Sequence, residues 1–238
     1  MLLIIQNDPE VPPGNFADTI RGLNIPCRIV LPYTGETLPP PSEVSAAIVL
    51  GGAMGVHETT QHPFLIQVKA FIRECVRTET PFLGVCLGGQ LLADVLGGRV
   101  SANSPHGEKG SLKVLLTAAG EADPLFAGIP HEFVTFQWHN DSFEIPAGGT
   151  LLATSAACGG QAFRFGARAW GTQFHPEVDR SIVGCWARWA EETAPHADRF
   201  LADFVLTEQG YLDVARRLLG NFLALAGFSA GNGTEMRP

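Results

Sequence analysis

Short apolar segments typical of buried β-strands alternate with helical patterns along the first half of the chain. The predicted strands are Leu2–Gln6, Cys27–Leu31, Ala46–Leu50 and Pro81–Val85. Between the last two strands, Pro63–Arg77 places apolar side chains at helical spacing, and Gln90–Leu96 predicts a second helix. Parallel strands need such crossover helices, and a sheet covered on both faces needs apolar strands. The pattern therefore predicts an α/β fold with a central, mostly parallel sheet and helices on both faces.

The pattern changes after residue 98, where strands are joined mainly by turns. The expected strands are Ser111–Thr117, Glu132–Gln137, Thr150–Ser155, Ala162–Phe165 and Ala169–Gln173, with a helical turn at Asp123–Ala127. They should complete the sheet and add a few antiparallel strands. Residues 180–227 are predicted to be helical, with breaks near Pro195 and Gly210, and residues 229–238 to form a frayed tail. We therefore expect an α/β domain over residues 1–190 and a helical C-terminal extension over residues 191–238.

Composition and charge exclude several classes of function. Hydrophobic residues make up 45% of the 238 residues, and the net charge is −8 without any basic run. Phosphate binding needs clustered Lys and Arg, so nucleic acid is not an expected partner. No apolar run approaches the roughly 20 residues that span a bilayer, and the N-terminus lacks the features of a signal peptide. We therefore expect a cytoplasmic protein without membrane contact.

The cysteines show no pattern typical of a metal site or a disulfide framework. Cys27, Cys75, Cys86, Cys158 and Cys185 are odd in number, widely spaced and include no CxxC pair. For four of them a small buried hydrophobic residue is the preferred interpretation. No metal ligand set is expected, because the histidines outside the motifs below also lack ligand spacing. Cys86 is the exception, because of the residues around it.

The segment Pro81–Gln90, with the sequence PFLGVCLGGQ, places an apolar strand before Gly84-x-Cys86-x-Gly88 and a helix. This is the order of a nucleophile elbow, with sulfur in place of the serine oxygen. The flanking glycines allow a turn sharp enough to project Cys86 from the strand end. The N-terminus of the following helix favours a thiolate, and the Leu87 N–H can donate to an oxyanion. Taken alone, the motif also fits a glycine-rich turn with an incidental buried cysteine.

Two further segments supply the partners that such a cysteine needs. Gln173–Glu177, with the sequence QFHPE, closes a strand with His175 and Glu177 on one face. A histidine held by a carboxylate is the base and orienting group that activates a cysteine. Leu50–Gly55, with the sequence LGGAMG, follows another strand, and its glycines would let the backbone approach a bound carbonyl. Each segment is weak evidence alone, but the three in this order predict an acyl-transfer site.

The sequence GVCLGGQ around Cys86, followed by QFHPE, resembles the class I glutamine amidotransferase family over residues 1–190. The resemblance implies a flavodoxin-like sheet and a catalytic triad of Cys86, His175 and Glu177. It also implies oxyanion N–H groups on Gly52 and Leu87. The family reaction requires no metal and no organic cofactor.

Within the family the chain is similar to stand-alone proteins that resemble the glutaminase domain of GMP synthase. This narrower likeness rests on the segments Gly52–Glu58 (GAMGVHE), Pro124–Gly128 (PLFAG) and Gln137–Asp141 (QWHND). In the family, the residue at Gln90 contacts the glutamine side chain and the last of these segments helps form the substrate pocket. The resemblance therefore makes Gln90, His139 and Asp141 candidates for substrate binding.

The function implied by the resemblance is hydrolysis of the γ-carboxamide of glutamine through a γ-glutamyl thioester on Cys86. Glutamine or a γ-glutamyl peptide would bind, and a separate synthase would accept any released ammonia. One alternative is a free-standing γ-glutamyl peptidase acting on γ-glutamyl peptides such as glutathione derivatives. A second alternative is a catalytically idle scaffold on the same fold.

Several side chains outside these motifs have more ordinary interpretations. Trp138, Trp186 and Trp189 are expected to pack in the core or at an interface. Glu58 and Glu108 are interpreted as surface carboxylates, with binding of a substrate α-amino group as the alternative. The apolar helical segment Phe200–Leu206 either covers the sheet or forms the contact of a homodimer.

Overall fold

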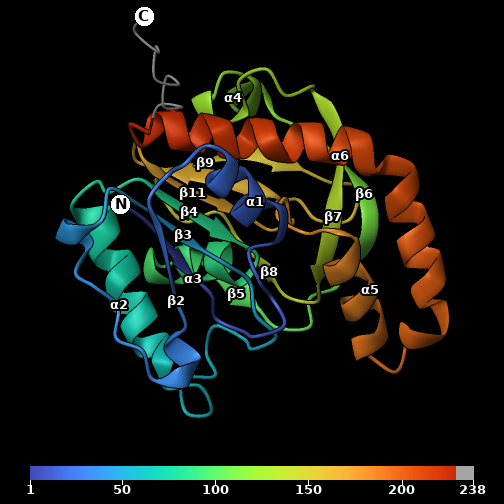
Figure 1. The fold of residues 1–238 in the computed structure, drawn as a ribbon, viewed down its shortest axis with the longest axis horizontal. Helices are drawn as coiled ribbons and strands as arrows, with labels where there is room; N and C mark the ends of the chain where they lie inside the picture. The colour runs from blue at the N-terminus through green and yellow to red at the C-terminus, as the bar shows by residue number, and fades with distance from the viewer. Residues whose placement is uncertain (229–238) are drawn as a thin grey trace, which may run out of the picture.

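The computed structural model describes residues 1–228, in which helices cover both faces of a nine-stranded sheet (Figure 1). The strand order is β2-β1-β3-β4-β11-β10-β9-β6-β7. The strands are β1 (Leu2–Ile5), β2 (Cys27–Val30), β3 (Ala46–Val49), β4 (Phe82–Val85), β6 (Glu108–Leu116), β7 (Glu132–His139), β9 (Gly149–Thr154), β10 (Ala162–Phe165) and β11 (Ala169–Thr172). The tail expected over residues 229–238 lies outside the described residues.

The first five strands in this order run parallel, and the remaining four continue the sheet antiparallel. Strands β1, β3, β4 and β11 are buried along their whole length. Strands covered on both faces are apolar at every position, which explains why they appear in the sequence as continuous apolar runs. The expected flavodoxin-like α/β sheet with added antiparallel strands is confirmed. Strand order reverses at β1, with β2 on one side and β3 on the other, and such a reversal opens a crevice at the carboxyl ends.

Two layers of helices enclose the parallel part of the sheet. The helices are α1 (Gly14–Gly22), α2 (Phe64–Arg77), α3 (Leu87–Val95), α4 (Ala118–Glu121), α5 (Arg180–Trp189) and α6 (Ala197–Leu225). Alternate residues of β1 divide between the layers: Leu2 and Ile4 join the hydrophobic cluster of α1 and α6, and Leu3 and Ile5 join that of α2 and α3. This is the period-two alternation of a strand buried on both faces.

Short elements complete the connections. They are the two-stranded sheet of β5 (Val100–Ser101) and β8 (Ser142–Phe143), and the 3-10 helices η1 (Pro32–Thr34), η2 (Pro41–Glu43), η3 (Pro124–Phe126) and η4 (Ala194–His196). The helical turn predicted over Asp123–Ala127 corresponds to η3. Among residues 1–228, no helix combines the length and apolar character needed to cross a membrane.

The C-terminal helices differ from prediction at one of the two expected breaks. The break near Pro195 is confirmed, because α5 ends at Trp189 and α6 begins at Ala197. The break near Gly210 is wrong, because α6 continues through that residue. A glycine inside a helix costs only about 0.5–1 kcal/mol, and burial of Tyr211 and its neighbours on α6 outweighs this. Helix α1 was not predicted from the sequence.

The packing of α6 bears on two sequence predictions. Phe204 is fully buried against Phe136 of β7, whereas Leu206 is 84% exposed. Farther along α6, Leu218 and Phe222 join the same hydrophobic cluster as the sheet residue Trp170. The segment therefore covers the sheet, and a homodimer contact stays a prediction. A separable extension over residues 191–238 also stays a prediction.

The turn between β4 and α3 depends on two glycines in backbone contact with their surroundings. A Cβ at Gly88 would lie 2.0 Å from the carbonyl oxygen of Val49, and one at Gly84 would lie 2.4 Å from the Gly88 carbonyl carbon. Gly88→Ala is therefore expected to lower the free energy of unfolding by roughly 2–4 kcal/mol, measured by urea denaturation. Gly210→Ala is the matched control. No atom lies within 4 Å of a Cβ there, so this change should stabilise by about 0.5–1 kcal/mol. Equal destabilisation by both changes would contradict the interpretation.

Candidate active site

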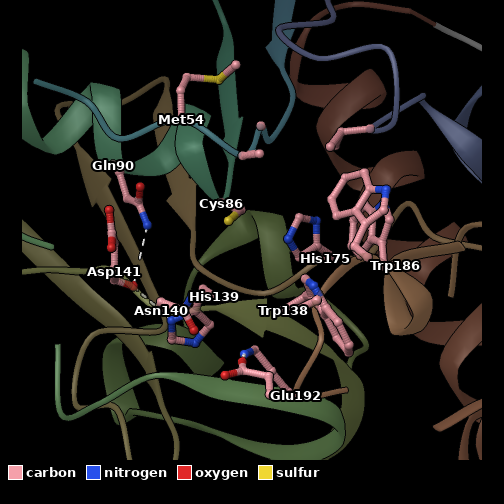
Figure 2. Close-up of a pocket in the computed structure, with 16 residues that line it drawn as sticks. Met54, Cys86, Gln90, Trp138, His139, Asn140, Asp141, His175, Trp186 and Glu192 are labelled. Atoms are coloured by element: carbon pink, nitrogen blue, oxygen red, sulfur yellow. Dashed lines mark hydrogen bonds and ion pairs between the residues drawn. The ribbon is translucent and has the colours of Figure 1, made fainter. Parts of the chain in front are cut away.

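The carboxyl ends of β3, β4 and β11 meet at one pocket of about 260 Å³ (Figure 2). Sheet register places Thr172 beside Val85 and Val49 beside Gly84, so the segments that follow these strands leave the same edge. Side chains from these segments, from the end of β7 and from α5 line the pocket. This is the edge at which open α/β sheets bind ligands.

Cys86 occupies a strained turn between β4 and α3. Its backbone angles are φ 50° and ψ −106°, a conformation that costs a non-glycine residue about 1–3 kcal/mol. Its N–H donates to the Thr172 carbonyl and its own carbonyl accepts from the Gln90 N–H, each at 2.8 Å. Helix α3 begins at Leu87, three residues before the predicted start. Cys86 therefore lies at the N-terminus of α3, with its side chain at the pocket surface.

His175 and Glu177 form a buried ion pair beside the thiol. The Nδ1–H of His175 donates to Oε1 of Glu177 at 2.7 Å, and the two residues are 2% and 0% exposed. Burial lowers the pKa of His175, but the negative charges of Glu177 and Cys86 outweigh it and raise the pKa from 6.5 to about 10. His175 is therefore an imidazolium at neutral pH, and Figure 2 shows its ring beside Cys86.

The loop of residues 175–178 is held by Asn15 of α1 and Tyr211 of α6, which hydrogen-bond all four of its backbone carbonyls. The side chain of Asn15 donates to the carbonyls of Pro176 and Val178 at 3.0 and 2.8 Å. Its backbone N–H donates to the carbonyl of Glu177 at 2.8 Å. The hydroxyl of Tyr211 lies 3.0 Å from the carbonyl oxygen of His175 and 3.2 Å from that of Val178. Two helices far apart in the sequence thus position the ion pair.

Gly51 and Gly52 bring a backbone loop against the thiol and the imidazole. A Cβ at Gly51 would lie 3.0 Å from Cε1 of His175 and 3.6 Å from Cβ of Cys86. A Cβ at Gly52 would lie 2.9 Å from Cδ2 of Leu87. Only residues without side chains let the loop approach the pocket this closely.

Gln90, His139 and Asp141 lie together on one side of the pocket. The side-chain amide of Gln90 and the Nδ1–H of His139 both donate to the backbone carbonyl of Asp141, at 3.5 and 2.8 Å. The Asp141 carboxylate in turn accepts the N–H of Asn103 at 2.9 Å. The structure therefore groups the three substrate-binding candidates, although they come from α3 and from the end of β7.

Gln173 is a pocket neighbour that sequence reasoning missed. The residue is fully buried, its side-chain nitrogen lies 3.6 Å from Sγ of Cys86, and its Oε1 accepts from Gln90 at 3.3 Å. It can therefore donate to the thiolate and join Cys86 to the polar side of the pocket. The sequence could have indicated Gln173 through its position two residues before His175, because alternate residues share one face of a strand.

The surface position expected for Glu108 is wrong. Strand β6 begins at Glu108 and pairs it with His139, so the carboxylate is 8% exposed and 3.6 Å from Nε2 of His139. Ser155 Oγ and the Gln161 side chain donate to it. Glu58 is exposed as predicted, and it accepts the N–H of Gly55 at 3.0 Å. Glu108 therefore lies next to His139 but is not among the residues that line the pocket.

Of the four other cysteines, Cys75 and Cys158 are buried as expected, whereas Cys27 and Cys185 are exposed, so the expectation of burial is wrong for these two. All five cysteines are free thiols. Burial raises the pKa of Cys27 to about 11 and that of Cys75 to about 12, so both stay protonated at neutral pH. Within residues 1–228, no group of three or more His, Cys, Asp or Glu side chains is arranged to hold a metal ion.

A cysteine elbow at the carboxyl edge of a parallel sheet, with a His–Glu ion pair beside it, agrees with one family in particular. The chain matches the family described as glutamine amidotransferase class-I over residues 15–184. The chain belongs to this family, which confirms the resemblance found in the sequence. Family membership implies an amidohydrolase.

Individual relatives agree with this assignment. The chain is 31% identical over 175 residues to the glutamine amidotransferase-like protein YfeJ of Salmonella typhimurium, covering 72% of this chain and 70% of that protein. It is 30% identical over 187 residues to one subunit of the glutamine-hydrolysing GMP synthase of Methanococcus maripaludis, covering 77% and 91%. A crystal structure of a glutamine amidotransferase from Thermotoga maritima is 31% identical with a TM-score of 0.80, covering 96% and 98% of the two chains.

Proposed function

We propose that this protein hydrolyses the γ-carboxamide of glutamine and related γ-glutamyl amides through a thioester on Cys86. The observation that carries the proposal is the strained Cys86 turn in the same pocket as the buried His175–Glu177 ion pair. A backbone conformation of this cost persists where the surroundings enforce it, and such strain clusters at active sites. Structural packing alone gives no reason to combine the three groups.

The proposed first step is attack of the Cys86 thiolate on the γ-carbonyl. Because its pKa is raised, His175 holds the proton that it then gives to the leaving nitrogen. Glu177 fixes the orientation of the imidazole ring. The N–H groups of Gly52 and Leu87 are the proposed donors to the tetrahedral oxyanion. Collapse of this intermediate releases the amine and leaves a γ-glutamyl thioester, which water activated by His175 then hydrolyses to glutamate. All reacting groups belong to the chain, so the proposed steps use no metal or organic cofactor.

Gln90, His139 and Asp141 are the proposed contacts for the glutamyl part of the substrate. Gln90 and His139 both donate to the backbone carbonyl of Asp141, which places these polar groups along one side of the pocket. A zwitterionic glutamyl group needs such partners, because burying its charges without hydrogen bonds would be costly.

With glutamine as substrate, the released ammonia needs an acceptor. The relative from Methanococcus maripaludis is named as one subunit of a glutamine-hydrolysing GMP synthase. We therefore propose a separate synthase chain as the partner for the glutamine reaction. A γ-glutamyl peptidase, the second candidate function, would need no such partner, and it is favoured by Trp138, Trp186 and Trp189, which line the pocket and could contact a larger leaving group.

Detection of the thioester tests the proposal. Protein mixed with glutamine and quenched in acid within the first turnovers should carry a γ-glutamyl adduct that peptide mapping places on Cys86. The adduct should disappear on treatment with hydroxylamine, which cleaves thioesters. Turnover without any adduct on Cys86 would contradict the proposed mechanism. Absence of both turnover and adduct would instead favour the idle scaffold.

A further inference from the structure

Cys86 lies between two chemically different sides of the pocket (Figure 2). Gln90 and its polar neighbours lie on one side of the thiol. His175 lies on the other side, with Trp186 and Trp138 next to it. An amide also has two sides, an acyl group and an amine, and attack at its carbonyl must direct them to different parts of the pocket.

The position of the acid assigns the amine to the aromatic side. Cleavage of an amide requires a proton donor within hydrogen-bond reach of the leaving nitrogen. Under the proposed function, on which this inference rests, that donor is His175. Its ring packs edge-on against Trp186, with centroids 4.7 Å apart. Any group carried by the leaving nitrogen is therefore delivered to the tryptophans, and the glutamyl part keeps the polar side.

Three tryptophans form a continuous row on this side. Trp186 and Trp189 lie three residues apart on α5 and stack with centroids 5.9 Å apart, and Trp138 of β7 lies 6.5 Å from Trp186. The expectation that they serve only for packing is incomplete, because all three line the pocket. Trp186, in the middle of the row, is 1% exposed, whereas Trp189 at one end is 41% exposed and Trp138 at the other end is partly exposed, so the two ends provide the accessible aromatic surface. Ammonia would leave this apolar surface uncovered, whereas a flat ring would bury part of it.

A cation lies beside the row. Lys109 is the only lysine or arginine among the lining residues within 1–228. Its ammonium pairs with Glu192 and lies 5.9 Å from the centroid of the Trp138 ring. The Lys109 side chain is 21% exposed and that of Glu192 is 67% exposed, so the carboxylate partner lies in solvent, where ion pairs contribute little. A ligand carboxylate can therefore replace Glu192 on Lys109 at small cost.

We propose that the site takes γ-glutamyl dipeptides whose second residue is aromatic. The ring lies on the tryptophan row, and its α-carboxylate binds Lys109. The Cys86 sulfur bonds to the γ-carbonyl carbon, the C–N bond breaks, and the His175 proton goes to the nitrogen, releasing the aromatic amino acid. Water then gives a proton to His175 and its oxygen to the carbonyl carbon. The C–S bond breaks, returning the thiolate and releasing glutamate, so one water is consumed per peptide.

The test compares kcat/KM for γ-glutamyl-phenylalanine, γ-glutamyl-alanine and glutamine. Wild type is expected to prefer the phenylalanine dipeptide over the alanine dipeptide by about 10-fold or more. Trp189→Ala should reduce this ratio by about 10-fold, and Trp189→Phe should retain most of it. Trp189 is the position to change because it is half-exposed, whereas Trp186 is buried in the core. Leu206→Ala, an equally apolar but distant exposed site on α6, is the control and should keep the wild-type ratio.

A second variant tests the carboxylate contact. Lys109→Gln should lower kcat/KM for γ-glutamyl-phenylalanine about 10-fold relative to γ-glutamyl-anilide, which has a ring but no carboxylate. Equal kcat/KM for the two dipeptides, or a ratio unchanged in Trp189→Ala, would overturn the proposed subsite. Hydrolysis of glutamine in that case would leave the proposed function standing. Folded wild type that hydrolyses none of the substrates would contradict the proposed function itself.

Discussion

Cys86→Ala is expected to reduce glutamate release from glutamine by at least about 10³-fold, because no thioester can form without the sulfur. The measurement is initial-rate glutamate release on purified protein, with circular dichroism to confirm folding. Cys27→Ala is the matched control, because Cys27 lies on the edge strand β2 and burial raises its pKa to about 11. The control should keep the wild-type rate. Activity of Cys86→Ala within about tenfold of wild type would exclude the thioester mechanism.

Substitution of Cys86 by glycine should stabilise the fold relative to substitution by alanine and at the same time remove activity. At φ 50° and ψ −106°, any side chain on residue 86 is strained, whereas glycine adopts this conformation at little cost. Cys86→Gly should therefore exceed Cys86→Ala in free energy of unfolding by about 1 kcal/mol, although both variants are expected to be inactive. Equal stability of the two variants would show that the turn stores little strain.

Glu177→Gln is expected to lower kcat by roughly 10²–10⁴-fold while preserving the side-chain shape. The amide can still hydrogen-bond to His175, but it no longer supplies the charge that raises the histidine's pKa. Burial still lowers the pKa of His175 and one of the charges that oppose it is gone, so His175 loses its proton more readily. The loss should appear in kcat more than in KM, because Glu177 is fully buried behind His175. A change confined to KM would contradict the assigned role.

The pH dependence of stability checks the same pair. The pKa of His175 is about 10 in the folded protein and 6.5 by its ordinary value, so the folded state binds this proton more tightly. The stabilisation is complete below pH 6.5 and is lost as pH rises through about 10. The free energy of unfolding of wild type should fall over this range, measured by urea denaturation, and fall less in Glu177→Gln. Parallel profiles for the two proteins would contradict the proposed coupling.

Much of the sheet could be predicted because its strands are buried on both faces. Segments such as Leu2–Ile5 must then be apolar at every position, and that pattern is visible without any structure. Helix α1 was missed because its nine residues bury only Phe16 and Ile20. The break at Gly210 was predicted wrongly because a local helix penalty is smaller than the packing energy of α6 against the sheet.

The candidate site also contains both residues that the sequence indicates and residues that only the structure places there. Cys86, His175 and Glu177 could be named as candidates from the sequence because short motifs with glycine and period-two spacing specify local geometry. Gln173 belonged to one of these motifs, but its contact with the thiol depends on a rotamer that only the surrounding packing selects. Glu108 was misplaced because pairing with His139 extends β6, and strand pairing is a contact between distant segments.

The order of strand, cysteine turn and helix, and the placement of the histidine and glutamate on one face, follow from the amino-acid sequence alone. These features depend on neighbouring residues, whose sterics and spacing act locally. The tertiary structure decided what surrounds the thiol: the clamp by Asn15 and Tyr211, and the tryptophan row beside His175. Such contacts join residues far apart in the chain. They are selected by burial and packing, and no local sequence pattern predicts them.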